Sequence, residues 1–163
     1  MRKKSSFLWW FGIVGGIVLL LSFRTIQSYI KGTGPDVRVP CINPTLPIPA
    51  SLHIHPELTI MVNGEKIPVP TNIGIELAGC ERALHTHDET GTIHVEPNFA
   101  QDFTLGDFFY VWNRPLSKDQ ILDYKTDNDH EIVMTVDGVP SDAFEKLVLK
   151  DKQQIKIEYR KRS

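Results

Sequence analysis

Histidine is scarce in this chain of 163 residues, yet five of its six histidines lie between His53 and His94. Three of them belong to the stretch LHTHDETGTIHVE, residues 84–96, and two lie upstream in SLHIHPELTI, residues 51–60. Imidazole suits zinc, copper, iron and nickel, and a metal site needs three or four ligands at about 2 Å from the ion. This spacing points to metal chemistry wherever the fold brings the rings together.

The downstream stretch has the pattern of a hairpin that gathers its histidines on one face. If residues 88–91 form a four-residue loop, His87 pairs with Thr92 and His85 pairs with His94. Directly paired residues project to the same side of a sheet, with their Cβ atoms about 4.5–5.5 Å apart. The three histidines of this hairpin are therefore the first choice of metal ligands.

The upstream pair and two carboxylates are further candidates. His53 and His55 share one face of an extended segment, because strand side chains alternate, and they complete the site if their strand neighbours the hairpin. Asp88 and Glu96 could orient ligating imidazoles through their N–H groups, or act as a base beside a metal-bound water. Asp88 could instead only shape the loop. His130 stands alone, and we expect a surface residue there.

Two other interpretations of the histidines are a pH-responsive cluster and an ordinary polar sheet face. Five imidazoles in matching phase favour a metal site over both. For a nitrogen-rich site outside the cytoplasm the Irving–Williams order favours a copper ion, whereas a carboxylate ligand such as Glu96 or Asp88 would favour a zinc ion. We expect copper, with zinc as the alternative.

Three functions follow from such a site. The first is a membrane-anchored protein that holds copper, or delivers it to a membrane enzyme complex. The second is a metal-dependent enzyme, a zinc hydrolase or a copper redox enzyme, using Glu96 or Asp88 beside the metal. The third is an accessory subunit of such a complex, in which the metal stabilises the fold. The sequence has no Ser/His/Asp or Cys/His nucleophile pattern and no glycine-rich phosphate loop, so we assign no catalytic residue.

The N-terminus has the features of a membrane anchor. Residues 1–6 include three basic side chains, and residues 7–23 include no charged one. As a helix this run spans roughly 25 Å, close to the ~30 Å hydrocarbon core of a bilayer. A cleaved signal peptide is the other interpretation, but no A-x-A site follows. We predict a cytoplasmic segment at residues 1–6 and a transmembrane anchor at residues 7–23 of a single-pass cell-membrane protein, with the rest extracytoplasmic.

Partners and linkers can be predicted in part. Gly12 and Gly16 form a G-x-x-x-G step that could contact another membrane subunit. Charge is nearly balanced, with 18 basic and 20 acidic side chains, so we expect no nucleic-acid partner. Residues 24–50 are rich in proline and are predicted to be a semi-rigid spacer. Cys41 and Cys80 could form a disulfide between spacer and domain, or Cys80 could be a thiolate ligand.

Residues 51–163 are predicted to form the extracytoplasmic metal-binding domain. We expect an α+β fold, with a small mixed β-sheet packed on one or two helices and preceded by the transmembrane helix. The expected elements are a hairpin around Asn63-Gly64, the histidine hairpin, a helix from Leu105 to Trp112 capped by Thr104, a helix from Ser117 to Tyr124, a strand ending at Asp137-Gly138, and a closing strand in QQIKIEYR.

Two resemblances add to this interpretation. The segments HIH, LHTHD, IHVE and FTLGDFF together resemble a group of uncharacterised membrane-anchored prokaryotic proteins, over most of the outer domain. That resemblance implies no activity. The run FTLGDFF…EIVMTVDGVP…LVLKDKQQIKIEY, roughly sixty residues long, resembles the tail of β-grasp domains, where a hairpin, a crossing helix and a closing strand recur.

Overall fold

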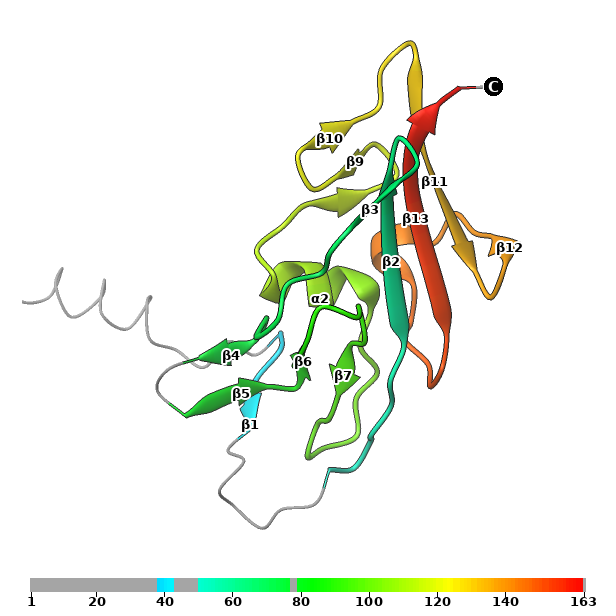
Figure 1. The fold of residues 1–163 in the computed structure, drawn as a ribbon. Coiled ribbons are helices and arrows are strands. Elements are labelled where there is room, and N and C mark those ends of the chain that lie inside the picture. Colours follow the sequence, from blue (N-terminus) through cyan, green and yellow to red (C-terminus); the bar gives the residue numbers. More distant parts are fainter. Residues whose placement is uncertain (1–37, 43–49, 77–78, 163) are drawn as a thin grey trace, which may run out of the picture. The chain divides into compact units, whose positions relative to one another are not determined.

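The long strands of the protein lie side by side in one five-stranded sheet (Figure 1). The computed structural model describes residues 38–42, 50–76 and 79–162. The order of the sheet is β12-β11-β13-β2-β3, in which β13 runs parallel to β2 and all other neighbours are antiparallel. Its strands are β2 (Glu57–Val62), β3 (Glu65–Ile67), β11 (His130–Val136), β12 (Val139–Pro140) and β13 (Gln154–Lys161).

Alternating apolar residues on the three central strands build the core. Leu58 and Ile60 of β2 and Ile157 of β13 are fully buried, and Ile132 and Met134 of β11 are nearly so. Each fully buried aliphatic side chain contributes roughly 1.5–3 kcal/mol relative to an exposed one. The alternation read from the sequence is therefore the pattern that fixes which face of this sheet is covered.

The two glycine turns occur as predicted. Asn63 and Gly64 have φ of 50° and 88° and connect β2 to β3, and Asp137 and Gly138 have φ of 52° and 80° and connect β11 to β12. Positive φ at both central residues is the mark of the type I′ hairpin turn, which Asn-Gly and Asp-Gly favour. Strand β3 ends at Ile67, directly before a proline, at the edge of the sheet.

Helix α2 (Leu105–Val111) confirms the predicted helix. Thr104 is its N-cap, and its hydroxyl accepts from the Asp107 N–H while the Asp107 carboxylate accepts from the Thr104 N–H, which completes a capping box. The buried face of the helix joins the hydrophobic core through Leu105, Phe108 and Phe109. The helix packs against β6 (Leu84–His85) and against a short 3-10 helix, η1 (Phe144–Lys146).

The predicted helix from Ser117 to Tyr124 is wrong. Its residues form three short antiparallel strands instead: β8 (Leu116–Ser117), β9 (Gln120–Ile121) and β10 (Tyr124–Lys125). The Ser117 hydroxyl accepts from the Asp119 backbone N–H, a local bond that competes with helix formation. Leu122 has φ of 51°, outside the right-handed helical region.

The expected α+β class is therefore wrong. In the described residues the structure is mostly strand, with several small sheets and a single α-helix. Two of the small sheets are β1-β5-β4, made of Cys41–Ile42, Cys80–Arg82 and Ile75–Glu76, and β6-β7, in which β7 is His94–Val95. The five-stranded sheet, with two parallel strands at its centre, is compatible with the β-grasp resemblance.

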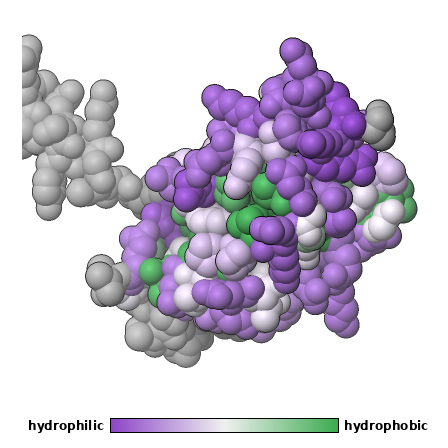
Figure 2. Space-filling view, turned by 45° about the horizontal axis from the view of Figure 1, so that its top comes forward, coloured by the Kyte–Doolittle hydropathy of each residue, from purple (hydrophilic) through white to green (hydrophobic). Residues whose placement is uncertain are grey.

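None of the helices in the described residues is long and apolar enough to cross a bilayer. The predicted transmembrane helix at residues 7–23, with Gly12 and Gly16, lies outside the described residues, as do the segment 1–6 and most of the spacer. Figure 2 shows one face of the folded part, mainly hydrophilic, with a smaller hydrophobic area between hydrophilic side chains.

Candidate metal centre

Three backbone segments place one histidine each in a row. Strand β6 pairs with β7 so that His85 lies opposite His94, as the loop length predicts. On the other side of β7, bridges pair Ile54 with Val95 and Glu57 with Thr92 in the same antiparallel register, which sets His55 opposite His94. The segment carrying the upstream pair is therefore the neighbour of the hairpin, a strand order that the sequence left open.

The side chains follow this register. The His94 ring lies 4.7 Å from the His55 ring and 5.2 Å from the His85 ring, between centroids. His53 extends the row beyond His55, with 4.7 Å between the ring centroids, and the His87 ring lies beside both His94 and His85, at 4.5 Å and 4.8 Å. All five predicted histidines thus lie together.

Two sets of donors can be distinguished within this row. The outer group consists of His53, His55 and Glu96. The inner group consists of His85 and His87. Glu81 is outside the set of mutually close donors, but we include it in the inner group because its carboxylate lies 3.0 Å from His85 Nε2. His94 belongs to both sets. Its ligand atom lies within 4.8 Å of those of His53, His55 and Glu96 in the outer set, and within 4.8 Å of those of His85 and His87 in the inner set.

The separations between donor atoms match those around one ion. Two nitrogens bound at ~2.0–2.1 Å lie about 3.3 Å apart at a tetrahedral angle and about 2.9 Å apart at a right angle. In the outer group the Nε2 atoms of His53 and His55 are 3.1 Å apart, and in the inner group those of His85 and His87 are 3.2 Å apart. Each pair could therefore bind one ion with little movement.

The inner group contains the most strongly oriented imidazole. His85 is fully buried, and its Nδ1 lies 2.9 Å from the Arg82 carbonyl oxygen, which can only accept a hydrogen bond. Nδ1 therefore carries the proton and Nε2 presents its lone pair toward His87 and Glu81. Burial lowers the pKa of His85, although the Arg82 hydrogen bond and the Glu81 charge oppose that effect, so the neutral, ligating form is favoured.

The outer group contains no fully buried imidazole. The His53 side chain is 58% exposed, whereas that of Glu96 is 24% exposed. Desolvation, with the nearby charges of His94 and His53, lowers the pKa of His55. Burial acts to raise the pKa of Glu96, but the His94 hydrogen bond and the surrounding imidazoles outweigh it and the pKa is lowered. A carboxylate and neutral imidazoles are the forms that bind metals.

Glu81 is the site residue that sequence reasoning missed. It lies in β5, where its carboxylate oxygen is 3.0 Å from His85 Nε2 and 3.9 Å from His87 Nε2. The signal was its phase: Glu81 precedes His85 by four residues, so it shares the face of His85 in a continuous strand. The bend at Ala83 separates β5 from β6 and hides that relation.

The remaining predicted residues have other roles. Asp88 accepts hydrogen bonds from the backbone N–H and hydroxyl of Thr90, which lower its pKa, and so it shapes the loop of the hairpin. His130 lies outside both groups and is partly buried. Its Nδ1 is 3.0 Å from an Asp127 oxygen and its ring stacks on Tyr159.

Gly91 allows the hairpin to pair closely with the start of β2. Its φ is 95°, and a Cβ atom added there would lie 2.1 Å from the Leu58 carbonyl oxygen of β2. The Leu58 backbone N–H donates to the Gly91 carbonyl oxygen at 2.8 Å. Only glycine combines this backbone conformation with so close an approach, and the approach is what brings His94 beside the segment leading into β2.

The hydrogen bonds of Thr86 and a disulfide fix the backbone of the segments that carry the inner group. The buried Thr86 side chain, between the two inner histidines, donates to the Pro70 carbonyl oxygen and accepts from the Ile73 N–H. Cys41 and Cys80 form a disulfide that joins β1 to β5, next to Glu81. Cys80 is therefore not available as a thiolate ligand.

The outer group is held by the turn before β13. The His55 N–H donates to an Asp151 carboxylate oxygen at 3.0 Å, and the Lys152 N–H donates to the His55 carbonyl oxygen at 3.2 Å. These bonds fix the backbone at His55 from the side opposite β7.

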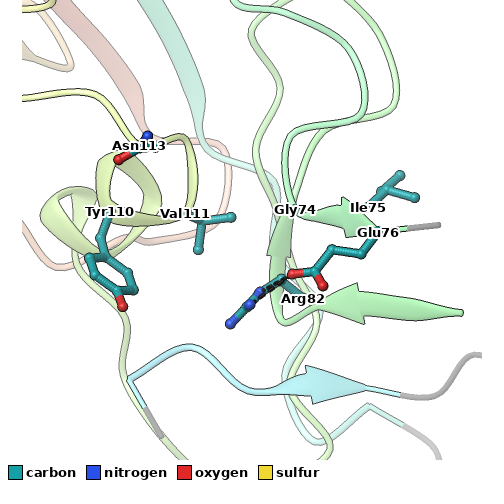
Figure 3. Close-up of a pocket in the computed structure, with 7 residues that line it drawn as sticks. All are labelled: Gly74, Ile75, Glu76, Arg82, Tyr110, Val111 and Asn113. Atoms are coloured by element: carbon teal, nitrogen blue, oxygen red, sulfur yellow. Dashed lines mark hydrogen bonds and ion pairs between the residues drawn. The ribbon is translucent and has the colours of Figure 1, made fainter. Parts of the chain in front are cut away.

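A separate cavity of about 300 Å³ lies beside helix α2 (Figure 3). Within it Arg82 pairs with Glu76 at 2.7 Å. No histidine lines this cavity, so the candidate metal centre is elsewhere. Its lining residues are Gly74, Ile75, Glu76, Arg82, Tyr110, Val111 and Asn113.

Comparison of the chain with protein families, curated proteins and solved structures found no match. The case for a function therefore depends on the geometry of the histidine cluster.

Proposed function

We propose that this protein is an extracytoplasmic metal-binding protein that holds a late first-row metal ion, copper before zinc, and keeps it available for transfer to a membrane enzyme complex. The observation that supports this is the row of five imidazoles from three backbone segments, with donor atoms spaced as in a metal site. A polar sheet face would not need so many rings in one register.

The choice of copper follows from the donor set. Nitrogen donors outnumber carboxylates, and among divalent ions such sites bind copper most tightly. Contact of Glu81 and Glu96 with the imidazoles is the specific observation that favours zinc as the alternative. Both ions bind this set, and competition between them decides which one is held.

Transfer, as opposed to permanent storage, is supported by the exposure of one imidazole ligand in each group. The His53 and His87 side chains are 58% and 51% exposed, while the His85 side chain is fully buried. An exposed ligand can be replaced by a donor of an incoming protein while the buried ligands still hold the ion. The apolar run at residues 7–23 would keep such a carrier at the membrane surface.

The second candidate is a metal-dependent enzyme, favoured by the two carboxylates beside the imidazoles. It differs from the first in requiring turnover. Hydrolysis of activated esters by the zinc-loaded chain, or oxidation of a phenol by the copper-loaded chain, would support it.

The test of metal binding uses the full-length chain freed of metal by chelator and dialysed against equimolar Cu²⁺ or Zn²⁺. We expect bound metal by elemental analysis, and nitrogen hyperfine structure in the copper EPR spectrum. The double variant His85→Asn and His94→Asn should lose the ion, because it removes the oriented and the shared ligand. Asn at position 85 can still donate to the Arg82 carbonyl.

His130→Asn is the matched control, since that imidazole lies outside both groups. It should bind as the unmodified chain does. Absence of metal from the unmodified chain, or full retention by the double variant, would refute the proposed site.

A further inference from the structure

We infer that the histidine cluster holds two metal ions, with the His94 ring bridging them as an imidazolate. This rests on the proposed function and extends it. The outer and inner groups have one member in common, and that member lies in the central strand of the three.

The donors divide evenly between two ions. The outer ion would take His53, His55, Glu96 and one nitrogen of His94, and the inner ion would take His85, His87, Glu81 and the other nitrogen. Each ion then has four donors, the coordination number that zinc prefers and copper accepts. A single ion could not bind the donors of both groups, because two donor atoms on opposite sides of one ion lie only about 4.2 Å apart.

The direction of the His94 ring assigns its two nitrogens. Nδ1 lies 3.1 Å from Glu96 Oε1, and the same oxygen lies 3.1 Å from His53 Nε2, so Nδ1 faces the outer group. This leaves Nε2 as the ligand atom for the inner ion, on the ring that lies 4.5 Å from His87 and 5.2 Å from His85 between centroids.

Charge balance also favours two ions. When the second ion binds, the remaining N–H bond of His94 breaks, its electron pair becomes the second metal bond and the proton passes to solvent. Two divalent ions bring four positive charges, of which the imidazolate and the carboxylates of Glu81 and Glu96 offset three. The carboxylates are only partly exposed, and a nearly neutral centre costs less to desolvate there than unpaired charges would.

The test is a copper titration of the full-length, metal-free chain, followed by elemental analysis and EPR. We expect saturation at about two ions per chain, since two sites of four donors are available. Copper(II) ions joined by an imidazolate couple antiferromagnetically. The integrated EPR intensity should therefore rise with the first equivalent and fall with the second, while a half-field signal appears.

His94→Ala removes the bridge and His87→Ala removes a terminal ligand, so the two form a matched pair. The first variant should show EPR intensity equal to all of its bound copper, with no half-field signal. The second should keep the coupled signal at saturation, with weaker binding of one ion. Circular dichroism of both variants in chelator checks that each is folded.

Three results separate the inferences. Saturation at one ion, or two ions whose EPR intensity adds without coupling, would overturn the bridged pair and leave the proposed function standing. Binding of no copper at all would overturn both. Coupling that survives in His94→Ala would show that another group is the bridge.

Discussion

The inner and outer groups contain the same donors, two imidazoles and a carboxylate, but they are positioned in different ways. His85 is fully buried and its ring is oriented by the Arg82 carbonyl. The His53 side chain is 58% exposed, and it contacts Glu96 and His55 of its own group. His85 therefore loses little freedom on binding a metal, whereas His53 must be ordered by it, and so must His87, whose side chain is 51% exposed. The buried His85 thus favours affinity, and the two exposed imidazoles favour exchange.

The largest effect should come from a change that damages both halves at once. Gly91→Ala places a Cβ 2.1 Å from the Leu58 carbonyl at a backbone φ of 95°. Strain and forced displacement together should cost roughly 3–5 kcal/mol of unfolding free energy. Urea unfolding in chelator measures the loss, and copper affinity should fall for both ions.

Gly138→Ala is the matched control for this substitution. Its φ is 80°, but no atom lies within 4 Å of the added Cβ. It should cost only about 1 kcal/mol from the left-handed conformation. Equal losses in the two variants would show that the close approach of Gly91 to β2 has no special role.

Removing the disulfide should weaken the inner half more than the outer half. Cys41→Ser with Cys80→Ser frees β5, which carries Glu81 and the Arg82 carbonyl. With a sequence separation of 39 the bond should contribute about 4 kcal/mol. Calorimetry of the variant in chelator measures that loss, and copper titration should show the tighter of the two affinities reduced.

Retention of the tighter affinity in the disulfide variant would contradict the link between β5 and the inner group. Loss of stability without any change in metal binding would place the disulfide in a purely structural role.

Single ligand substitutions compare the two halves directly. His85→Asn removes the oriented ligand and should lower the affinity for the inner ion on the order of 100-fold, whereas His53→Asn should lower that for the outer ion about tenfold. Competition with a chelator of known affinity measures both. Equal losses would mean that burial and the Arg82 hydrogen bond do not make the inner ligand better.

The smallest effect concerns pH and the apoprotein. The pKa of His85 is lowered by burial, so the unfolded chain binds more protons than the folded one as pH falls below the ordinary value near 6.5. Its contribution to stability is complete above that pH and is lost on acidification toward the lower folded pKa. Urea unfolding in chelator at pH 7.5 and 5.5 should show this decrease.

His85→Asn, measured at the same two pH values, should show a smaller decrease because the titrating group is gone. His55 contributes in the same direction, since its pKa is lowered too. A decrease of the same size in the variant would assign the pH dependence to other groups.

Local patterns in the sequence predicted what local physics determines. Alternation, the Asn63-Gly64 and Asp137-Gly138 turns and the Thr104 cap gave the main strands and helix α2, and loop length gave the pairing of His85 with His94. These features are determined by residues close together in the chain, so a single sequence is enough to predict them.

Features outside these patterns decided the rest. The bridge between Ile54 and Val95 joins segments about forty residues apart, and neither segment carries a pattern that identifies its partner. The bend at Ala83 hid the relation of Glu81 to His85. Near Ser117 a local hydroxyl bond and a left-handed Leu122 accompany short strands where the apolar spacing predicted a helix.

The bonds from the turn before β13 to His55 set the order in which the centre can be assembled. Because β13 lies between β11 and β2, the sheet closes only when the C-terminal strand arrives, long after the histidine hairpin has been synthesised. Such non-local parallel pairing is slow. The inner ligands, in contrast, are joined by local pairing. We therefore expect the nascent chain to acquire its inner metal ligands first, and the outer group only at the end of folding.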